Sequence, residues 1–328
     1  MNVLILGGRE IVMNKKKNTN PKILFIGGTP RGLELIKALV RAGERIIYAA
    51  IMKEDPHEAV KVSDLIKAFC DRQGIPSKII TKIRREDVPR ILRLRPDVAF
   101  VCGWRTLIPP ELYKNVPLGC LAAHDSLLPK YRGFAPLNWA IINGEKETGV
   151  TLFKIDDGSV DSGKVFGQKK VAIGSDDTAS SVYPRIIKAS VALYRDFLAA
   201  LRSGRIRWRG QDESKATYCC KRTPEDGRID WNKPAKEIYN LIRALVPPYP
   251  CAWTLFNGGK ILIEKASLPK KDMCYAGNMP GKVISVTDDG VVVLCGMGQV
   301  TIKSIITPKG EHQRAEKALS SIRITLGQ

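Results

Sequence analysis

The chain has 328 residues, of which 44% are hydrophobic and 26% charged, a composition typical of a globular protein with a buried core. This length favours two domains. No apolar run reaches the roughly 18 residues that a membrane span needs. The start of the chain has neither a basic leading region nor a small-residue cleavage site, so we expect a cytoplasmic protein. The eight cysteines contain no C-x-x-C pair, which predicts buried free thiols and no metal site.

The formal net charge of +20 points to an anionic partner, either a nucleic acid or a metabolite. The basic residues are spread along the whole chain instead of forming one cluster. A general surface bias, or adaptation to heat, explains such a distribution equally well. The charge by itself therefore does not select a nucleic acid.

Apolar strand patterns alternate with helical patterns from residue 22 to about residue 210. We expect strands at residues 22–26, 45–52, 77–81, 98–102, 118–123, 149–155 and 165–173. Helical patterns separate the first four strands, and a long one follows the last. Strands that are apolar on both faces and alternate with helices predict a doubly wound, mostly parallel sheet, Rossmann-like in layout.

Two further regions flank this predicted domain of residues 22–210. Residues 211–328 contain a helical pattern at 235–245 and then five short strands, at 253–256, 260–265, 281–286, 291–295 and 300–305. With "NGG" and "DDG" turns among them, these strands predict a small antiparallel, OB-like β-barrel. Residues 1–21 are expected to form an N-terminal extension, although "NVLILGG" resembles the later "KILFIGG" and an extra edge strand is the alternative.

The turn "IGGTPRG" follows the first predicted strand of residues 22–26 and opens a helix. Its backbone amides are placed to bind an anion. The dinucleotide fingerprint G-x-G-x-x-G is incomplete, however, because Thr29 stands where the second glycine belongs. No acidic residue closes the following strand in the usual way either. An NAD-dependent oxidoreductase is thus a disfavoured alternative.

Polar segments follow three of the predicted strands: "GWRTLIP", "HDSLLPKYRG" and "DDGSVDSG". Ligands of open parallel sheets bind at the carboxyl ends of the strands, so these segments are expected to converge on one cleft. His124 is a natural general acid or base, and Asp161 is placed to orient it or to stabilise its protonated form. Lys130 and Arg132 offer donors to an anionic substrate. On these residues alone, a catalytic and a structural His124 stay equally open.

The stretch "HDSLLPKYRGFAPLNWAIINGEKETGVTLFKIDDGSVDSG" resembles the signature of the 10-formyltetrahydrofolate-dependent formyltransferases. That signature runs N-x-H-x-S-L-L-P-x-[YW]-R-G-x-A-P and continues with G-x-x-x-T-G-V-T. The later stretch "RTPEDGRIDWNKPAKEIYNLIRALVPPYPCAW" is similar to the entry of the barrel domain in methionyl-tRNA formyltransferase and in the aminoarabinose-modifying enzymes. The resemblance implies transfer of a formyl group from 10-formyltetrahydrofolate, as cosubstrate, to a primary amine, without a metal.

The same resemblance implies roles for individual residues. His124 would stabilise an oxyanion or move a proton, with Asp161 supporting it. The folate would contact Trp104, Leu107, Ser126, Leu127, Leu128, Pro129, Phe134, Asp157, Gly158, Ser159 and Val160. The acceptor substrate would contact Lys130, Tyr131, Arg132, Gly133 and Asn138.

One position departs from the family pattern. Ala122 stands where the family has an asparagine that donates a hydrogen bond to the developing oxyanion. Losing one such donor typically lowers the rate by about 10²–10³-fold. Three interpretations stay open: Asn138 replaces the missing amide, the chemistry is slower or altered, or the chain is a folate- or nucleotide-binding homologue without turnover. An engineered replacement of the asparagine would also explain the alanine.

The acceptor is predicted to be a nucleotide-linked amino sugar, because "KYRG" and "PLNW" look closer to the sugar enzymes. The short connection "KEDPHEAVKVSD" also lacks the longer basic insertion of the tRNA enzymes. Methionyl-tRNA is the alternative, favoured by the net charge and the second domain. No membrane partner is expected, and a homodimer is left open.

Overall fold

The computed structural model describes residues 3–6, 9–12, 20–55, 61–269 and 273–328. The chain divides into two compact units, each assembled from several stretches. The first unit comprises Met1–Gly133, Gly149–Val171 and Pro184–Tyr218, and the second comprises Phe134–Thr148, Ala172–Tyr183 and Cys219–Gln328. The predicted domain limits, 22–210 and 211–328, remain our proposal for the evolutionary domains.

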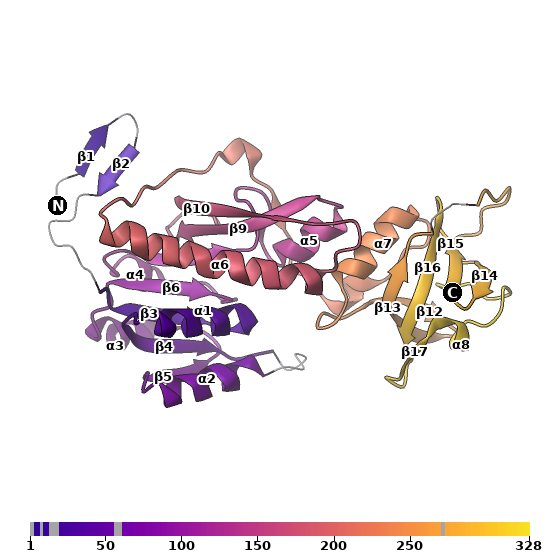
Figure 1. Cartoon of the computed structure of the whole chain (residues 1–328), viewed down its shortest axis with the longest axis horizontal. Coiled ribbons are helices and arrows are strands. Elements are labelled where there is room, and N and C mark those ends of the chain that lie inside the picture. The colour runs from indigo at the N-terminus through magenta and orange to yellow at the C-terminus, as the bar shows by residue number, and fades with distance from the viewer. Residues whose placement is uncertain (1–2, 7–8, 13–19, 56–60, 270–272) are drawn as a thin grey trace. The chain divides into compact units, whose positions relative to one another are not determined.

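A seven-stranded sheet forms the centre of the first unit (Figure 1). Its strand order is β10-β9-β7-β6-β3-β4-β5. The five neighbouring strands β5, β4, β3, β6 and β7 run parallel to one another, whereas β9 runs antiparallel to β7. The bounds are β3 (Ile23–Gly27), β4 (Ile46–Met52), β5 (Ser77–Ile80), β6 (Val98–Cys102), β7 (Cys120–His124), β9 (Glu147–Lys154) and β10 (Val165–Ala172). The predicted mostly parallel sheet is confirmed, with strand ends shifted by one or two residues.

Helices cover both faces of this sheet. On one face, Phe100 of β6 packs against Tyr194 and Phe197 of α6 (Ala179–Arg202), with ring centroids 4.7 and 6.0 Å apart. Helix α1 (Thr29–Arg41) lies on the same side, as Figure 1 shows. On the other face, α3 (Val88–Arg93) and α4 (Pro110–Tyr113) bury their apolar side chains in a core with β3 and β6. Strands that are apolar on both faces need this double cover, which is why they read as continuous hydrophobic runs.

The remaining elements of the chain are shorter or belong to connections. They are α2 (Val62–Arg72), η1 (Arg85–Asp87), β8 (Arg132–Gly133), α5 (Pro136–Ile142), η2 (Glu213–Lys215), β11 (Tyr218–Cys219) and η3 (Pro224–Gly227). The sequence pattern did not predict α5, which begins after Ala135 in a left-handed conformation, with φ of 48°. A proline at its first position is favourable for a helix start, since the missing N–H would be unsatisfied there anyway.

An antiparallel sheet dominates the second unit. Its order is β12-β13-β16-β15-β14, and β17 pairs with β16. The strands are β12 (Ala252–Phe256), β13 (Gly259–Ser267), β14 (Val283–Thr287), β15 (Gly290–Leu294), β16 (Gln299–Ile306) and β17 (His312–Arg314), accompanied by α7 (Ala235–Ala244) and α8 (Ala315–Ala318). The five predicted strands and their antiparallel pairing are confirmed. Closure of this sheet into an OB-like barrel stays a prediction.

The N-terminal extension contains a hairpin in which β1 (Val3–Leu6) pairs with β2 (Arg9–Val12). Neither strand joins the seven-stranded sheet, so "NVLILGG" is not an edge strand of it. The basic stretch at residues 13–19 lies outside the described residues. Within the described part of the chain, no helix is long and apolar enough to span a membrane.

Candidate active site

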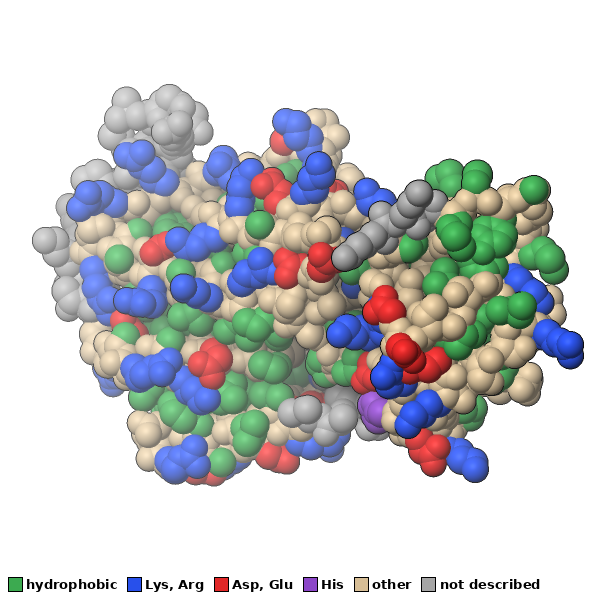
Figure 2. All heavy atoms as spheres, turned by 45° about the vertical axis from the view of Figure 1, so that its right-hand side comes forward, with side chains coloured by type: hydrophobic (Ala, Val, Ile, Leu, Met, Phe, Trp, Pro, Cys, Tyr) green, Lys and Arg blue, Asp and Glu red, His purple; other side chains and the backbone are tan. Residues whose placement is uncertain are grey.

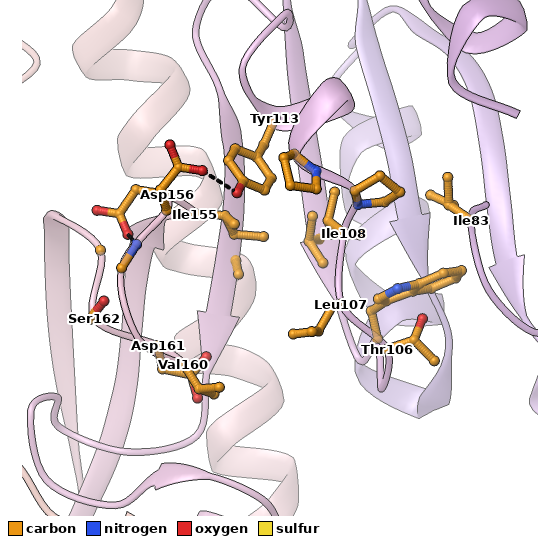
Figure 3. A pocket seen from close by; sticks show the side chains of 18 of the residues that line it. Ile83, Thr106, Leu107, Ile108, Tyr113, Ile155, Asp156, Val160, Asp161 and Ser162 are labelled. Carbon is orange, nitrogen blue, oxygen red and sulfur yellow. Dashed lines mark hydrogen bonds between the residues drawn. The ribbon is translucent and has the colours of Figure 1, made fainter. Parts of the chain in front are cut away.

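The polar segments that follow β6 and β9 line one pocket of about 710 Å³, whereas the segment "HDSLLPKYRG" after β7 contributes no residue to its lining. Because β9 runs antiparallel to β7, its end does not lie at the carboxyl edge of the parallel strands, and the single shared edge expected from the sequence does not account for both walls. Residues 104, 106–110 and 113 form one wall, and residues 155–163 form another. Figure 3 shows Leu107 and Ile108 on the first of these walls and Ile155 and Val160 on the second. Residues 82–86, which follow β5, complete the lining.

Several predicted site residues line this pocket. They are Trp104, Leu107, Ala122, Asp157, Gly158, Ser159, Val160 and Asp161. The sequence reasoning missed six apolar or aromatic lining residues: Ile83, Val101, Ile108, Tyr113, Phe153 and Ile155. Their only signal was hydrophobicity, which core and pocket residues share. The result is a largely apolar slot with polar groups at its edge, the usual character of a site for a flat organic ligand.

Trp104, which lines this slot, carries a buried donor. Its indole Nε1 is buried and has no hydrogen-bond partner among the described residues. A buried N–H without a partner costs free energy, so such a group usually serves a ligand or an ordered water. The residues present thus fit a heteroaromatic ring that packs between apolar walls and accepts one hydrogen bond.

A tyrosine–aspartate pair anchors the loop that follows β9. The hydroxyl of Tyr113 donates to Oδ1 of Asp157 at 2.6 Å, and Lys114 lies 2.9 Å from the other carboxylate oxygen. This bond raises the pKa of Tyr113 to about 12. The Tyr113 hydroxyl first, and then Lys114, lowers the pKa of Asp157. The hydrogen bond ties together α4 and the loop at residues 155–163, which form opposite walls of the pocket.

His124 ends β7 and lies buried between two oxygen atoms. Its Nε2 is 2.7 Å from the carbonyl oxygen of Tyr131, and its Nδ1 is 3.5 Å from Oδ2 of Asp161. A carbonyl oxygen only accepts, so Nε2 carries a proton and donates it to Tyr131. The other ring nitrogen, Nδ1, faces a carboxylate at the edge of the pocket.

Asp161 is held in place by backbone groups. It adopts a left-handed conformation with φ of 57°, and its Oδ2 accepts a hydrogen bond from the N–H of Gly133 at 2.8 Å. The side-chain nitrogen of Gln211 donates to the carbonyls of both Asp161 and Gly163, at 2.7 and 2.8 Å. A side chain at Gly163 would collide with the carbonyl of Lys154, so only glycine allows the loop to return here.

Thr151, a fully buried residue of β9, holds the loop at residues 126–129 by hydrogen bonds. Its hydroxyl donates to the carbonyl of Ser126 at 2.7 Å and accepts from the N–H of Leu128 at 3.0 Å. Ser126 is itself buried, and its hydroxyl donates to the carbonyl of Lys130. The residues Ser126, Leu127, Leu128 and Pro129 are absent from the pocket lining. Thr151 was not predicted, although it is the last residue of the "TGVT" motif.

Arg132 requires a correction. We expected its guanidinium to bind an anionic substrate, but the side chain is fully buried. It donates to both carboxylate oxygens of Glu213 at 2.6 and 2.8 Å, to Gln211 at 2.8 and 3.2 Å, and to the hydroxyl of Tyr218 at 3.0 Å. Its donors are taken up within the protein, so Arg132 ties the loop after His124 to the connector at residues 211–218.

Phe134 and Asn138 belong to the second unit. Asn138 is buried in α5, and its side-chain nitrogen donates to the carbonyl of Ala244 at 2.7 Å. This amide is therefore engaged within its own unit, which argues against Asn138 as the replacement donor for an oxyanion. The side chain of Phe134 is 46% exposed, and its contact with a folate stays a prediction.

The glycine-rich turn after β3 is closely packed. A Cβ at Gly27 would lie 2.6 Å from the ring of Phe25 and 2.7 Å from the carbonyl oxygen of Cys102. This packing alone accounts for the glycine at position 27, and a bound dinucleotide is not needed to explain it. Arg31, which follows in α1, forms a buried ion pair with Asp125, the residue after His124.

Comparison with known proteins assigns this arrangement to a family. Residues 37–198 match the formyl transferase model, and residues 221–323 match the model of the formyl transferase C-terminal domain. The chain belongs to the formyl transferase family.

Solved structures of other formyltransferases share the fold. The N-formyltransferase from Helicobacter canadensis, in complex with folinic acid and dTDP-3-aminofucose, matches with a TM-score of 0.66, 19% identity, and coverage of 86% of this chain and 98% of that one. Methionyl-tRNA formyltransferase from Clostridium thermocellum matches with a TM-score of 0.52, 22% identity, and coverage of 76% and 94%. HypX from Aquifex aeolicus, in complex with tetrahydrofolic acid, matches with a TM-score of 0.64, 18% identity and 92% coverage of this chain. The chain spans about half of HypX, 47% of its length.

Ala122 lies in the lining of the pocket. It pairs with Val101 on β6 and with Phe153 on β9, and all three residues line the pocket. None of these three side chains carries a hydrogen-bond donor. An asparagine at position 122 would therefore supply a polar group that this part of the pocket lacks.

Proposed function

We infer that this chain transfers a formyl group from 10-formyltetrahydrofolate to the primary amine of a nucleotide-linked amino sugar. The observation that carries the proposal is the pairing of His124 with Asp161, 3.5 Å apart, at a pocket with a buried, unpartnered indole donor. The family supplies the reaction class, and the pocket supplies a slot for a folate ring.

The cosubstrate supplies an activated formyl group attached to nitrogen. A new bond forms between the acceptor amine and the formyl carbon, the bond from that carbon to the folate nitrogen breaks, and the amine proton moves to the folate nitrogen. In this proposal His124 moves that proton through Nδ1, the ring nitrogen beside Asp161, while Nε2 remains bonded to the carbonyl of Tyr131. Asp161 orients the ring, and such a positioned proton-transfer group contributes about 10²–10⁴-fold to a rate.

The chain's own residues would hold the folate. Trp104 would donate its indole N–H to the folate ring system, and Ile108 and Ile155 would pack on the faces of that ring system (Figure 3). The Tyr113–Asp157 hydrogen bond keeps the two pocket walls in register. Apolar walls also exclude water, which strengthens each electrostatic interaction inside the site.

The amino-sugar acceptor is favoured over tRNA by two observations. The connection between β4 and α2 runs only from residue 53 to residue 61, although residues 56–60 lie outside the described part. On the face that Figure 2 shows, lysine and arginine side chains are interspersed with acidic and apolar ones and form no single basic patch. A protein that binds a nucleic-acid backbone typically carries its lysine and arginine side chains clustered on one face. Methionyl-tRNA remains the second candidate because of the net charge of +20.

An acceptor panel tests the proposal. The purified chain is incubated with 10-formyltetrahydrofolate and either nucleotide-linked amino sugars or methionyl-tRNA, and the formylated product is detected by mass spectrometry. We expect formylation of a nucleotide sugar, and formylation of methionyl-tRNA alone would overturn the assigned acceptor. Folate binding without turnover on any amine would identify a binding homologue instead.

A further inference from the structure

The two neighbours of β7 accompany it over different lengths. The parallel pairing of β7 with β6 runs as far as Ala122, which lies opposite Val101. The antiparallel pairing with β9 continues two residues further, to His124 opposite Thr151. The ladder to β6 therefore stops before His124 is reached, and the sheet holds the end of β7 from the β9 side.

The side chain of Asp125 ties the end of β7 to a helix instead. Asp125 follows His124 directly and forms an ion pair with Arg31 of α1. The side chains of Asp125 and Arg31 are only 15% and 9% exposed, so water and salt screen this pair little. The residue next to His124 is thus attached to α1 at the point where the β6 ladder has ended.

Arg31 extends from a rigid part of the chain. The N–H of Gly28 donates to the carbonyl of Cys102, the last residue of β6, at 3.1 Å. A Cβ at Gly103 would lie 2.5 Å from the carbonyl oxygen of Gly28, so the start of α1 packs directly on the end of β6. Because the backbone before Arg31 is fixed in this way, the ion pair restrains Asp125 and not the helix.

Asp125 supplies the negative charge that balances Arg31. The thiol of Cys102 and the hydroxyl of Tyr194 also interact electrostatically with Arg31, but burial raises the pKa of both groups. Both are consequently neutral at neutral pH. Removing one partner of a buried ion pair leaves the charge of the other uncompensated, so a change at either residue is expected to disturb the other.

We propose that the Arg31–Asp125 ion pair positions His124 by holding the end of β7, so that the imidazole stays between the carbonyl of Tyr131 and the carboxylate of Asp161; this inference rests on the proposed function. Nε2 and Nδ1 of the ring lie 2.7 and 3.5 Å from these two groups. Arg31 and Asp125 are absent from the pocket lining, so both act through His124. A displacement of about 1 Å at a reacting group can lower a rate by about 10²-fold.

Kinetics of four variants test the proposal. Asp125→Asn and Arg31→Met are each expected to lower kcat by about 10- to 100-fold, while the Kd of tetrahydrofolate changes by less than about twofold. Arg31→Lys keeps the charge without the planar guanidinium and should recover part of kcat. Arg31→Met combined with Asp125→Asn removes both charges and should restore the melting temperature but not kcat. Full recovery of kcat in this double variant would overturn the inference, because the uncompensated charge would then explain the loss.

An exposed ion pair on the same helix provides the control. Lys37 pairs with Glu34 at 2.9 Å on the solvent side of α1. Glu34→Gln removes this pair and is expected to leave kcat unchanged. A loss of kcat as large as that of Asp125→Asn would overturn the inference, since any disturbance of α1 would then suffice.

Nitrogen-15 NMR of the imidazole rings tests the positioning without turnover. The chain has three histidines, and His124→Asn assigns the signal of His124. At alkaline pH we expect the tautomer with its proton on Nε2 in the unaltered chain, and a mixture of tautomers in Asp125→Asn and Arg31→Met. The signal of His312, which pairs with Glu264, should not change.

The NMR result separates this inference from the proposed function. Unchanged His124 signals in both single variants would overturn the inference, whether or not the chain turns over. The expected change of tautomer in a chain that formylates no amine would overturn the proposed function and leave the positioning of His124 supported.

Discussion

The side chain of Gln211 binds the backbone carbonyl of Asp161. One side-chain nitrogen donates to the carbonyls of Asp161 and Gly163, while the side-chain oxygen accepts from the buried guanidinium of Arg132. Arg132 precedes Gly133, whose N–H binds the carboxylate of Asp161. A residue of the connector thereby fixes both the loop after β9 and the loop after His124, and with them the spacing of His124 and Asp161.

Gln211 is accordingly predicted to be a positioning residue. Gln211→Glu keeps an acceptor for Arg132 but loses the donor to the two carbonyls, so we expect kcat to fall by up to about 100-fold while the melting temperature changes little. Stopped assays and thermal unfolding on the same preparation measure the two effects. Gln73→Glu, at an exposed helix end, serves as the control. Loss of stability together with activity would show that Gln211 is only structural.

A donor introduced at Ala122 should accelerate the reaction. Because the neighbouring Val101 and Phe153 offer no donor, Ala122→Asn is expected to raise kcat by about tenfold or more, within the range for one oxyanion-stabilising group. Ala122→Leu has similar bulk without an amide and should lower kcat. If Ala122→Asn leaves kcat unchanged, the oxyanion is stabilised elsewhere.

The Tyr113–Asp157 bond predicts a pH dependence. The pKa of Tyr113 is raised from 10.0 to about 12, so the neutral phenol and its hydrogen bond persist below pH 10 and are lost as the pH rises through 12. Asp157 has a lowered pKa, and its contribution is present above its usual pKa and lost as the pH falls through the lowered one. Tyr113→Phe should weaken folate binding several-fold at neutral pH. A difference titration of phenolate absorbance against this variant should reveal one tyrosine that ionises near pH 12, and ionisation near pH 10 would contradict the buried bond.

The role of Arg132 is testable by stability. Arg132→Met removes a fully buried guanidinium that donates five hydrogen bonds, and we expect a loss of about 3 kcal/mol in the free energy of unfolding. Glu213→Gln keeps an acceptor on an exposed side chain and should lower the free energy of unfolding much less than Arg132→Met does. Urea unfolding measures the change in free energy for both variants, and an unchanged m-value shows that the change is one of stability. A stable Arg132→Met variant with a raised KM for the acceptor would instead support the substrate-binding role expected from the sequence.

The layout of the first unit was predictable because its strands, such as Val98–Cys102, are apolar on both faces and alternate with helices. The position of the pocket followed from this topology only in part: one wall follows the parallel strand β6, but the other follows the antiparallel strand β9, and the segment after β7 is absent from the lining. His124 and Asp161 were likewise predictable, although their roles came from the family motif and not from spacing. The structure brings them within 3.5 Å of each other.

The function of Arg132 was not predictable, because its partners lie far along the chain. Gln211, Glu213 and Tyr218 are 79 to 86 residues away, and local sequence does not show that a basic side chain in a polar loop is buried. Helix α5 was missed for a related reason. This helix is short and starts after a residue in the left-handed conformation, so neither its length nor its capping pattern indicated a helix. Asn138, which lies on it, consequently looked available.

The rate of formyl transfer with and without His124 tests the central claim most directly. Release of tetrahydrofolate is followed with 10-formyltetrahydrofolate and a nucleotide-linked amino sugar, for the unaltered chain and for His124→Asn. We predict measurable turnover by the unaltered chain and a decrease of about 100-fold or more in the variant. Equal rates in the two proteins, or no turnover by the unaltered chain on any amine, would contradict catalysis by the His124–Asp161 pair.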